Sequence, residues 1–206
     1  MTDRKTKTAA LSNLVPDTGL EQRRTVLRAA GSLAVASLSG GFIPIALAEE
    51  NSSRPKAGHR LVLADEADKR VPLQVSDIPL NGKPVFAFPY DLDSKTAQDG
   101  SRLNKVALVK VDAASLSDDA KKFAVDGVLA FSSVCTHQGC DVTEFVAKEH
   151  ALMCFCHFSK FDVLKSGAVA AGPAPRDLPY LPLKVEKNQL VVAGGFSSTP
   201  GVKKTG

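Results

Sequence analysis

All four cysteines of the chain and two of its four histidines lie in two short groups. The first group, Cys135–Cys140, reads C-x-H-x-x-C, and the second, Cys154–Ser159, reads C-x-C-H-x-S. Each group offers one thiolate sulfur and one imidazole nitrogen, from the residues Cys135, His137, Cys154 and His157. One further cysteine is left over in each group, and Cys140 and Cys156 could pair with each other. The spacing therefore predicts a metal centre held between two short loops.

This donor set by itself leaves three kinds of site open. Two cysteines and two histidines suit a tetrahedral zinc ion. Four cysteines in an exported protein could instead form two structural disulfides, with incidental histidines. The third possibility is an iron–sulfur cluster. Zinc leaves the second cysteine of each group, Gly139 and Ser159 without a role, which favours the cluster, and analysis of iron and acid-labile sulfide separates the three.

The two groups resemble the cluster loops of Rieske iron–sulfur proteins, specifically the high-potential kind that carries a disulfide beside the cluster. In that family a 2Fe–2S cluster has two thiolates on one iron and two imidazoles on the other. The resemblance assigns Cys135 and Cys154 to the buried iron. It assigns His137 and His157 to the outer iron.

Further residues match the same family. The resemblance assigns Cys140 and Cys156 to the disulfide that ties the loops together, and it implies that the Ser159 hydroxyl donates a hydrogen bond to a bridging sulfide. Gly139 also matches, and Gly172–Pro175 resembles the proline-rich loop that covers the cluster from one side. Ring-hydroxylating oxygenases carry a similar motif without the extra cysteine pair. This chain has neither the length nor the spare histidines for their mononuclear iron domain.

The mixed ligand set has a physical consequence for the reduction potential. Replacing two thiolates by neutral imidazoles removes negative charge from one iron, which makes the cluster easier to reduce. The potential then lies at roughly −150 to +300 mV, against about −400 mV for plant-type ferredoxins. The imidazole nitrogens that face away from the iron can gain or lose a proton, so electron and proton transfer can be coupled.

Four positions depart from the family pattern. Phe161 stands where many quinol-oxidising members have a tyrosine that bonds a cysteine sulfur. Phe155 replaces the usual proline between two cysteines, and Phe158 replaces the usual glycine. Gln138 replaces a common leucine at the exposed tip, and a polar tip argues against docking into an apolar quinone pocket.

The composition is that of one domain with an N-terminal extension. The chain has 206 residues, 44% of them hydrophobic, with ten phenylalanines and no tryptophan. Its net charge of +4 arises mainly in residues 1–48, which hold six Lys/Arg and three Asp/Glu. The remainder is nearly neutral, so no basic face indicates a nucleic-acid partner.

The N-terminal segment predicts export of the folded protein. Arg23 and Arg24 precede hydrophobic residues, as in a Tat signal, and residues 29–48 contain no charged residue. Ala46–Ala48 offers an A-x-A cleavage site before Glu49, which favours cleavage. The apolar run is also about long enough to serve as an uncleaved membrane anchor. Either outcome predicts a periplasmic location, or one on the periplasmic side of the inner membrane.

Short apolar runs between turn residues predict an all-β fold. The expected architecture is a Rieske-type antiparallel sandwich or barrel with an inserted cluster-binding lobe, preceded by the helical signal or anchor. The expected boundaries are residues 1–48 for the signal, 49–58 for a linker, 59–196 for the domain with its lobe at about 133–176, and 197–206 for a flexible tail. Expected strands lie at 59–63, 84–89, 105–111, 128–133, 142–145, 151–153, 160–163, 183–187 and 189–193. His59 is expected at the surface, and His150 in an exposed turn.

The expected activity is one-electron transfer as a subunit of a larger oxidoreductase, since no substrate-site motif occurs. The run His157–Asp162 resembles the small subunit of arsenite oxidase, which implies a molybdenum-containing large subunit and a cytochrome or azurin acceptor. A second possibility is the Rieske subunit of a cytochrome bc-type complex, with a cytochrome b partner, quinol as donor and a cytochrome c acceptor. A third is a free periplasmic electron carrier or redox sensor.

Overall fold

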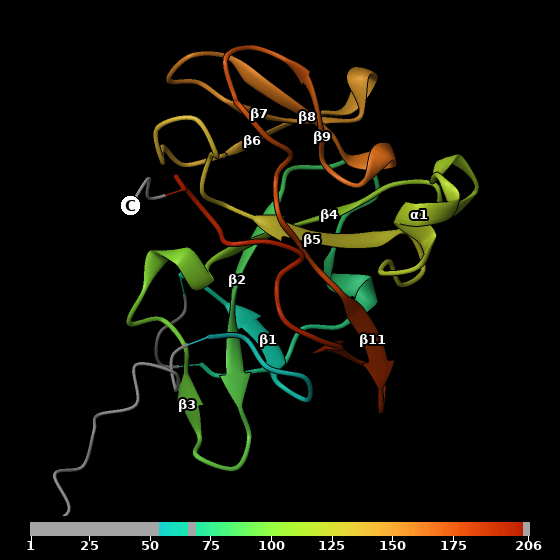
Figure 1. Ribbon diagram of the computed structural model, residues 1–206. Helices are drawn as coiled ribbons and strands as arrows, with labels where there is room; N and C mark the ends of the chain where they lie inside the picture. The colour runs from blue at the N-terminus through green and yellow to red at the C-terminus, as the bar shows by residue number, and fades with distance from the viewer. Residues whose placement is uncertain (1–53, 66–68, 204–206) are drawn as a thin grey trace, which may run out of the picture. The chain divides into compact units, whose positions relative to one another are not determined.

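The computed structural model describes residues 54–65 and 69–203, which fall within one compact unit spanning residues 47–206. This unit consists mostly of β-strands in one large and one small sheet (Figure 1). The predicted signal over residues 1–48 and the first part of the predicted linker lie outside the described residues. Within the described part, no helix is long and apolar enough to cross a membrane.

The large sheet is antiparallel and nearly closed on itself. Its strand order is β10-β5-β4-β2-β1-β12-β11, and β3 pairs with β2. Only Pro182 separates β10 from β11, which lie at opposite ends of this order, so the sheet curls into a barrel. The strands are β1 (Arg60–Leu63), β2 (Val85–Asp91), β3 (Thr96–Ala97), β4 (Val106–Lys110), β5 (Val128–Ser132), β10 (Tyr180–Leu181), β11 (Leu183–Glu186) and β12 (Gln189–Val192).

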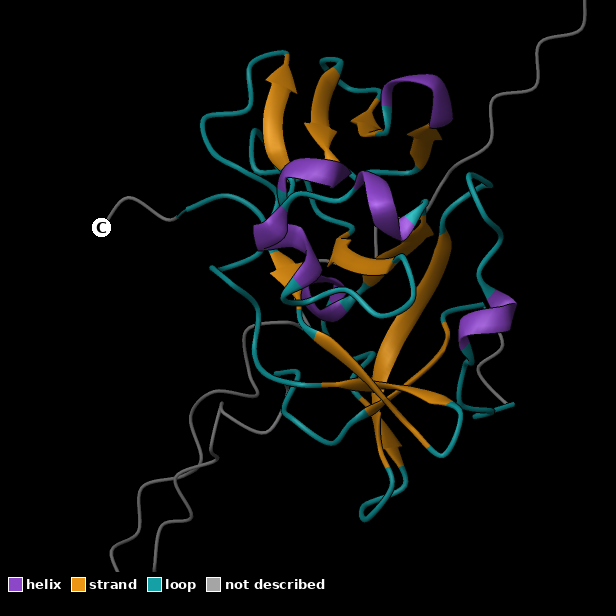
Figure 2. Cartoon of the chain, turned by 90° about the vertical axis from the view of Figure 1, so that its right-hand side faces the viewer, coloured by secondary structure: helices purple, strands orange, loops and turns teal. Residues whose placement is uncertain are grey.

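The small sheet is inserted between β5 and β10 and lies at one end of the unit (Figure 2). It has the order β6-β7-β8-β9, again antiparallel. Its strands are β6 (Glu144–Val146), β7 (Ala151–Cys154), β8 (Ser159–Asp162) and β9 (Ala168–Ala171). This arrangement confirms the predicted all-β fold with an inserted lobe.

Helical structure in the described part is confined to short turns. The α-helix α1 (Asp118–Lys121) begins after Ser117, whose hydroxyl accepts a hydrogen bond from the Ala120 N–H at 3.2 Å. The 3₁₀ turns are η1 (Val75–Asp77), η2 (Arg102–Asn104), η3 (Ala113–Ser115), η4 (Ala147–Glu149) and η5 (Val163–Lys165). These turns connect strands, and the β-sheets contribute most of the apolar core.

Two apolar clusters stabilise the unit. One fills the barrel and includes Leu61, Leu108 and Leu190, all fully buried. The other joins the large sheet to the small one, because Phe131 of β5 and Phe161 of β8 belong to it and are also fully buried. Each such side chain contributes about 1.5–3 kcal/mol by burial. The second cluster also contains Cys135 and Cys154, so both free thiols lie in apolar surroundings.

The structure differs from the sequence predictions at several places. Every predicted strand is present within a few residues, whereas β3, β9 and β10 were not predicted. His59 is buried, at 8% exposure, and not at the surface, because it precedes β1 and its Nδ1 accepts the Lys56 N–H. His150 is half-buried and ends η4 in a left-handed conformation.

The predicted flexible tail also differs from the structure over its described part, residues 197–203. The Ser197 N–H donates to the Tyr180 carbonyl at 2.9 Å, and the Tyr180 N–H donates to the Ser197 hydroxyl at 3.1 Å. Gly201 is buried. Small and polar residues here are held by contacts with distant parts of the chain, which local composition does not reveal.

Candidate metal centre

The first cluster loop follows β5 and is closed by its own backbone. The Cys135 N–H donates to the Cys140 carbonyl at 2.8 Å, and the Gly139 N–H donates to the Cys135 carbonyl at 3.1 Å. Gly139 has φ +77°, which glycine adopts without a steric penalty. The fold of this loop buries Cys135 at its base and leaves His137 half-buried.

The second cluster loop is the connection between β7 and β8. Cys154 ends β7, Ser159 begins β8, and the two residues pair in the sheet register. Cys154 and Ser159 are buried, whereas His157 is exposed between them. Phe158 has φ +58°, a left-handed conformation that is costly for a residue with a side chain. The resemblance implies glycine at this position, in agreement with this backbone geometry.

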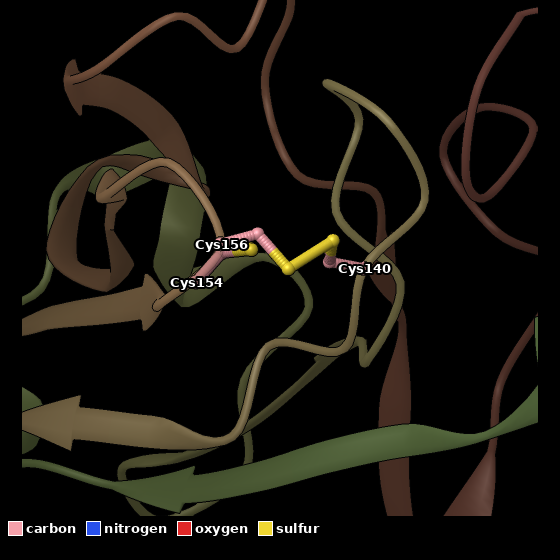
Figure 3. Close-up of side chains that lie close together, drawn as sticks. All are labelled: Cys140, Cys154 and Cys156. Carbon is pink, nitrogen blue, oxygen red and sulfur yellow. A yellow bond between two sulfur atoms is a disulfide. The ribbon is translucent and has the colours of Figure 1, made fainter.

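The two loops meet through sulfur and imidazole contacts. Cys140 and Cys156 form a disulfide, so the pairing that the resemblance implied is present (Figure 3). Cys154 lies beside this bond, and its sulfur and those of the disulfide are all within 4.8 Å of one another. The rings of His137 and His157 lie with centroids 4.6 Å apart and nearly perpendicular planes. Disulfide sulfurs are not thiolates, which leaves Cys135 and Cys154 as the sulfur donors.

The environment of Cys135 favours its protonated form in the absence of a cation. Burial raises the pKa of the Cys135 thiol, and the nearby Cys154 sulfur raises it too, whereas the His137 backbone N–H lowers it. A bound metal ion deprotonates such a thiol outright. Two adjacent buried thiols therefore fit a site that is completed by metal.

Two buried polar atoms of the cluster loops also fit a site that is completed by metal. Neither the Ser159 hydroxyl nor His137 Nδ1 makes a hydrogen bond within the part of the chain that the structure describes, although both atoms are buried. Buried polar atoms without partners are uncommon and call for an explanation. Thiols at the base, imidazoles farther out and a free serine hydroxyl fit a 2Fe–2S cluster with mixed ligands.

The predicted proline loop lies against the second cluster loop. Gly172 has φ +85°, and a Cβ atom at this position would lie 2.5 Å from Ser159 Cα and 2.8 Å from the Phe158 carbonyl oxygen. Only glycine allows so close a backbone approach. Gly172, the first residue of the predicted proline loop, therefore lies against the second cluster loop.

Two arginines to which sequence reasoning assigned no role contact the first cluster loop. Arg102 donates to the Gly139 carbonyl at 2.7 Å and forms an ion pair with Asp141 at 2.6 Å. The hydroxyl of Thr136 donates to the Arg176 carbonyl at 2.7 Å. Neither arginine belongs to a cysteine–histidine motif, and contacts across 37 or more residues have no local sequence signal.

Two loops that bring buried thiols and outer imidazoles together on a small antiparallel sheet define an iron–sulfur domain. The Rieske [2Fe-2S] domain family matches residues 90–182 of the chain. A cytochrome bc1 complex Rieske iron-sulfur subunit from Streptomyces lividans is 31% identical over 134 residues, which cover 63% of this chain and 78% of that protein. The chain therefore belongs to the Rieske iron–sulfur family, whose domain binds a 2Fe–2S cluster and transfers electrons.

Two other relatives are matched over a smaller share of their own length. A respiratory nitrate reductase subunit Rieske from Haloferax mediterranei is 41% identical over 85 residues, which cover 41% of this chain and 38% of that protein. A second Streptomyces bc1 Rieske subunit, from Streptomyces coelicolor, is covered over 38% of its length, so this chain spans well under half of these two relatives. The solved soluble domain of Rieske protein II from Sulfolobus acidocaldarius has 24% identity and a TM-score of 0.38 over 49% of this chain and 68% of that one.

Proposed function

We propose that Cys135 and Cys154 bind the inner iron of the cluster and that His137 and His157 bind the outer iron. The burial of both thiols and the 4.6 Å approach of the two imidazole rings support this assignment. Alanine at any of the four positions is expected to abolish bound iron and acid-labile sulfide in the purified protein. The matched control is His150→Asn, since asparagine tolerates the left-handed backbone of that residue. Full iron and sulfide in His157→Ala contradicts the assignment.

The proposed route for the electron is the exposed edge of His157. A bound 2Fe–2S cluster supplies one-electron redox chemistry. His157 presents its ring to solvent, and the neighbouring Phe155 and Phe158 are 53% and 63% exposed. Large exposed apolar side chains gathered on one loop are typical of a contact surface. We infer that these phenylalanines lie against an apolar surface of a redox partner while His157 reaches its electron donor.

The function that this geometry supports best is the Rieske subunit of a cytochrome bc-type quinol–cytochrome c reductase. In such a complex the His157 ring would accept a hydrogen bond from quinol, and the two exposed phenylalanines would line the apolar approach. The bc1 Rieske subunits among the relatives support this choice. The single observation that carries it is the apolar border of the exposed His157.

The test measures cluster reduction by quinol in membranes that contain the protein. Quinol is expected to reduce the cluster, and inhibitors of quinol sites are expected to block that reduction. Purification from the same membranes is expected to recover a cytochrome b together with this chain. Reduction that continues in the presence of these inhibitors, with no cytochrome b recovered, contradicts the proposal.

A second candidate is the small subunit of a larger periplasmic oxidoreductase of the arsenite oxidase kind. The relative from Haloferax mediterranei, described as a nitrate reductase subunit, favours this alternative. The exposed polar Gln138 and the absence of a hydroxyl at Phe161 also suit it better than a quinol oxidase. Co-purification of a molybdenum-containing subunit supports this candidate, and recovery of the chain alone supports a free electron carrier.

We further propose that the chain is exported through the Tat pathway and works on the periplasmic side of the inner membrane. The twin arginines at 23 and 24 and the uncharged run over residues 29–48 support export. The Cys140–Cys156 disulfide suits an oxidising compartment. N-terminal sequencing of the exported protein tests cleavage: a first residue of Glu49 is expected, and an intact N-terminus indicates a retained anchor.

A further inference from the structure

The C-terminal strap, residues 197–202, lies across the first cluster loop. The backbone of Gly201 packs on Val134, since a Cβ on Gly201 would lie 3.2 Å from Val134 Cγ1. Farther along, a Cβ on Gly139 would lie 3.6 Å from Val202 Cγ2, so Val202 reaches the tip of the loop. The strap thus contacts Val134, directly before Cys135, and Gly139, two residues after His137. In Figure 1 the red C-terminal segment runs back toward the small sheet.

Arg176 holds this strap in place. Its guanidinium donates to the Ser198 hydroxyl at 3.2 Å, to the Thr199 carbonyl at 2.7 Å and to the Gly201 carbonyl. A planar guanidinium can serve several acceptors at once, which a lysine ammonium cannot reproduce with the same geometry. Arg176 is half-buried, so these bonds are partly shielded from water.

The backbone of the same residue contacts the first cluster loop directly. Thr136 is 1% exposed and lies between Cys135 and His137, and its hydroxyl donates to the Arg176 carbonyl at 2.7 Å. Arg176 also follows directly after the proline loop at residues 172–175. One residue therefore joins the first cluster loop, the proline loop and the strap.

We propose that Arg176 is a positioning residue: by holding the C-terminal strap against Val134 and accepting the Thr136 hydrogen bond, it fixes the first cluster loop and so retains the iron that His137 binds. This inference rests on the ligand roles proposed above. Within the part of the chain that the structure describes, the hydrogen bonds of Arg176 go to Thr136 and to the strap, so Arg176 acts on the first cluster loop through these two.

The test compares the release of iron from the cluster-loaded full-length chain into a chelator, together with the electron paramagnetic resonance spectrum of the reduced protein. Arg176→Gln is expected to release iron about tenfold faster, the factor that corresponds to one net hydrogen bond. A chain ending at Ser197 is expected to behave in the same way. Arg176→Lys keeps the charge and part of the hydrogen bonding, so its rate of iron release is expected to lie between those of Arg176→Gln and the unaltered protein.

Two matched controls separate this role from a general loss of stability. Arg70→Gln breaks an exposed ion pair with Asp99 in another part of the unit, and a chain ending at Lys203 keeps the strap. Both controls are expected to release iron at the unaltered rate. The resonance line positions are expected to shift in Arg176→Gln and in the chain ending at Ser197 only.

Any of the following results overturns the inference. If Arg176→Gln and the chain ending at Ser197 lower only the unfolding temperature, with unchanged line positions and release rate, Arg176 has a structural role alone. If the unaltered protein itself holds no cluster, the proposed function fails together with the inference. If it holds one and Arg176→Gln matches it in every measurement, only the inference fails.

Discussion

At the scale of single residues, the site depends on side chains that surround the cysteines and histidines. Phe161 is fully buried in the same apolar cluster as Cys135 and Cys154, the two proposed sulfur ligands. Ser159 has a buried hydroxyl without a hydrogen bond in the described part of the chain. Hydrogen bonds to the sulfurs stabilise the more negative, reduced state of a cluster, and they raise its potential.

The first prediction concerns the hydroxyl that Phe161 lacks. Phe161→Tyr is expected to raise the midpoint potential, because the added hydroxyl can donate to a cysteine sulfur. A difference of about 1 kcal/mol between the two redox states corresponds to roughly 40 mV for one electron. Protein-film voltammetry measures the change, and Ser159→Ala, which removes a donor, is the reverse control with a lower potential. An unchanged or lower potential in Phe161→Tyr contradicts the placement of this ring.

The second prediction separates backbone strain from partner binding at Phe158. Phe158→Gly is expected to raise the free energy of unfolding by about 0.5–1 kcal/mol, since glycine adopts φ +58° without a Cβ clash. The same change removes an apolar side chain that is 63% exposed, and slower electron exchange with the partner is therefore expected. Denaturant unfolding and stopped-flow reduction measure the two effects. Phe155→Ser is the matched variant, expected to slow electron exchange without the gain in stability.

At the scale of elements, the small sheet and the loops beside it hold the centre together. The hairpin of β7 and β8 carries Cys154 and Ser159 at its turn end, next to the second cluster loop, and the disulfide joins that loop to the first one. Gly172 lets the proline loop rest on this hairpin. The metal-binding geometry thus depends on backbone contacts between segments as well as on the ligands themselves.

The third prediction tests the contact at Gly172. Gly172→Ala places a methyl group 2.5 Å from Ser159 Cα in a left-handed backbone, so one of the two loops has to move. A loss of about 1–3 kcal/mol in the free energy of unfolding and a lower cluster content are expected. Gly100→Ala is the control, because nothing lies within 4 Å of its added methyl group. Equal stability and equal iron content in the two variants contradict the close packing of the proline loop on the hairpin.

Sequence patterns predicted much of this element structure for clear physical reasons. The strands β4 and β5 are short apolar runs between polar turns, and the cluster loops have fixed spacings of cysteine and histidine. The two-residue strand β10 and the exposed strand β9 have weak patterns, because one is very short and the other is half-exposed alanine and valine. Their pairing depends on β5 and β8, which local sequence does not specify.

At the scale of the whole molecule, the described unit combines a nearly closed barrel with a smaller sheet that carries the metal centre. The shared apolar cluster around Phe131 and Phe161 fixes the small sheet on the barrel. The barrel itself contributes no cysteine or histidine ligand, so it serves as a rigid base. The strap was missed by sequence reasoning, since Gly, Ser, Thr and Pro there resemble a tail and the contact partner Arg176 lies 22–25 residues earlier.

The fourth prediction concerns His59, a buried histidine directly before β1 and far from the cysteines in sequence. Burial lowers the pKa of His59 below its usual value, and this effect outweighs the attraction of Asp91. A histidine with a lowered pKa in the folded state loses stability as pH falls through 6.5, because the unfolded chain binds the proton more readily. The unfolding temperature is expected to fall between pH 7.5 and pH 5.5, and the fall is expected to be smaller in His59→Gln than in the unaltered protein. An equal loss in both proteins contradicts a role for His59.

The measurement that tests the central claim most directly is combined iron, zinc and acid-labile sulfide analysis with electron paramagnetic resonance of the reduced full-length protein. Two irons and two sulfides per chain are expected, with a signal of the Rieske type, because the chain belongs to a 2Fe–2S family. Cys154→Ala is expected to lose both metal and signal. A folded protein that contains zinc without sulfide and gives no resonance signal after reduction contradicts the claim.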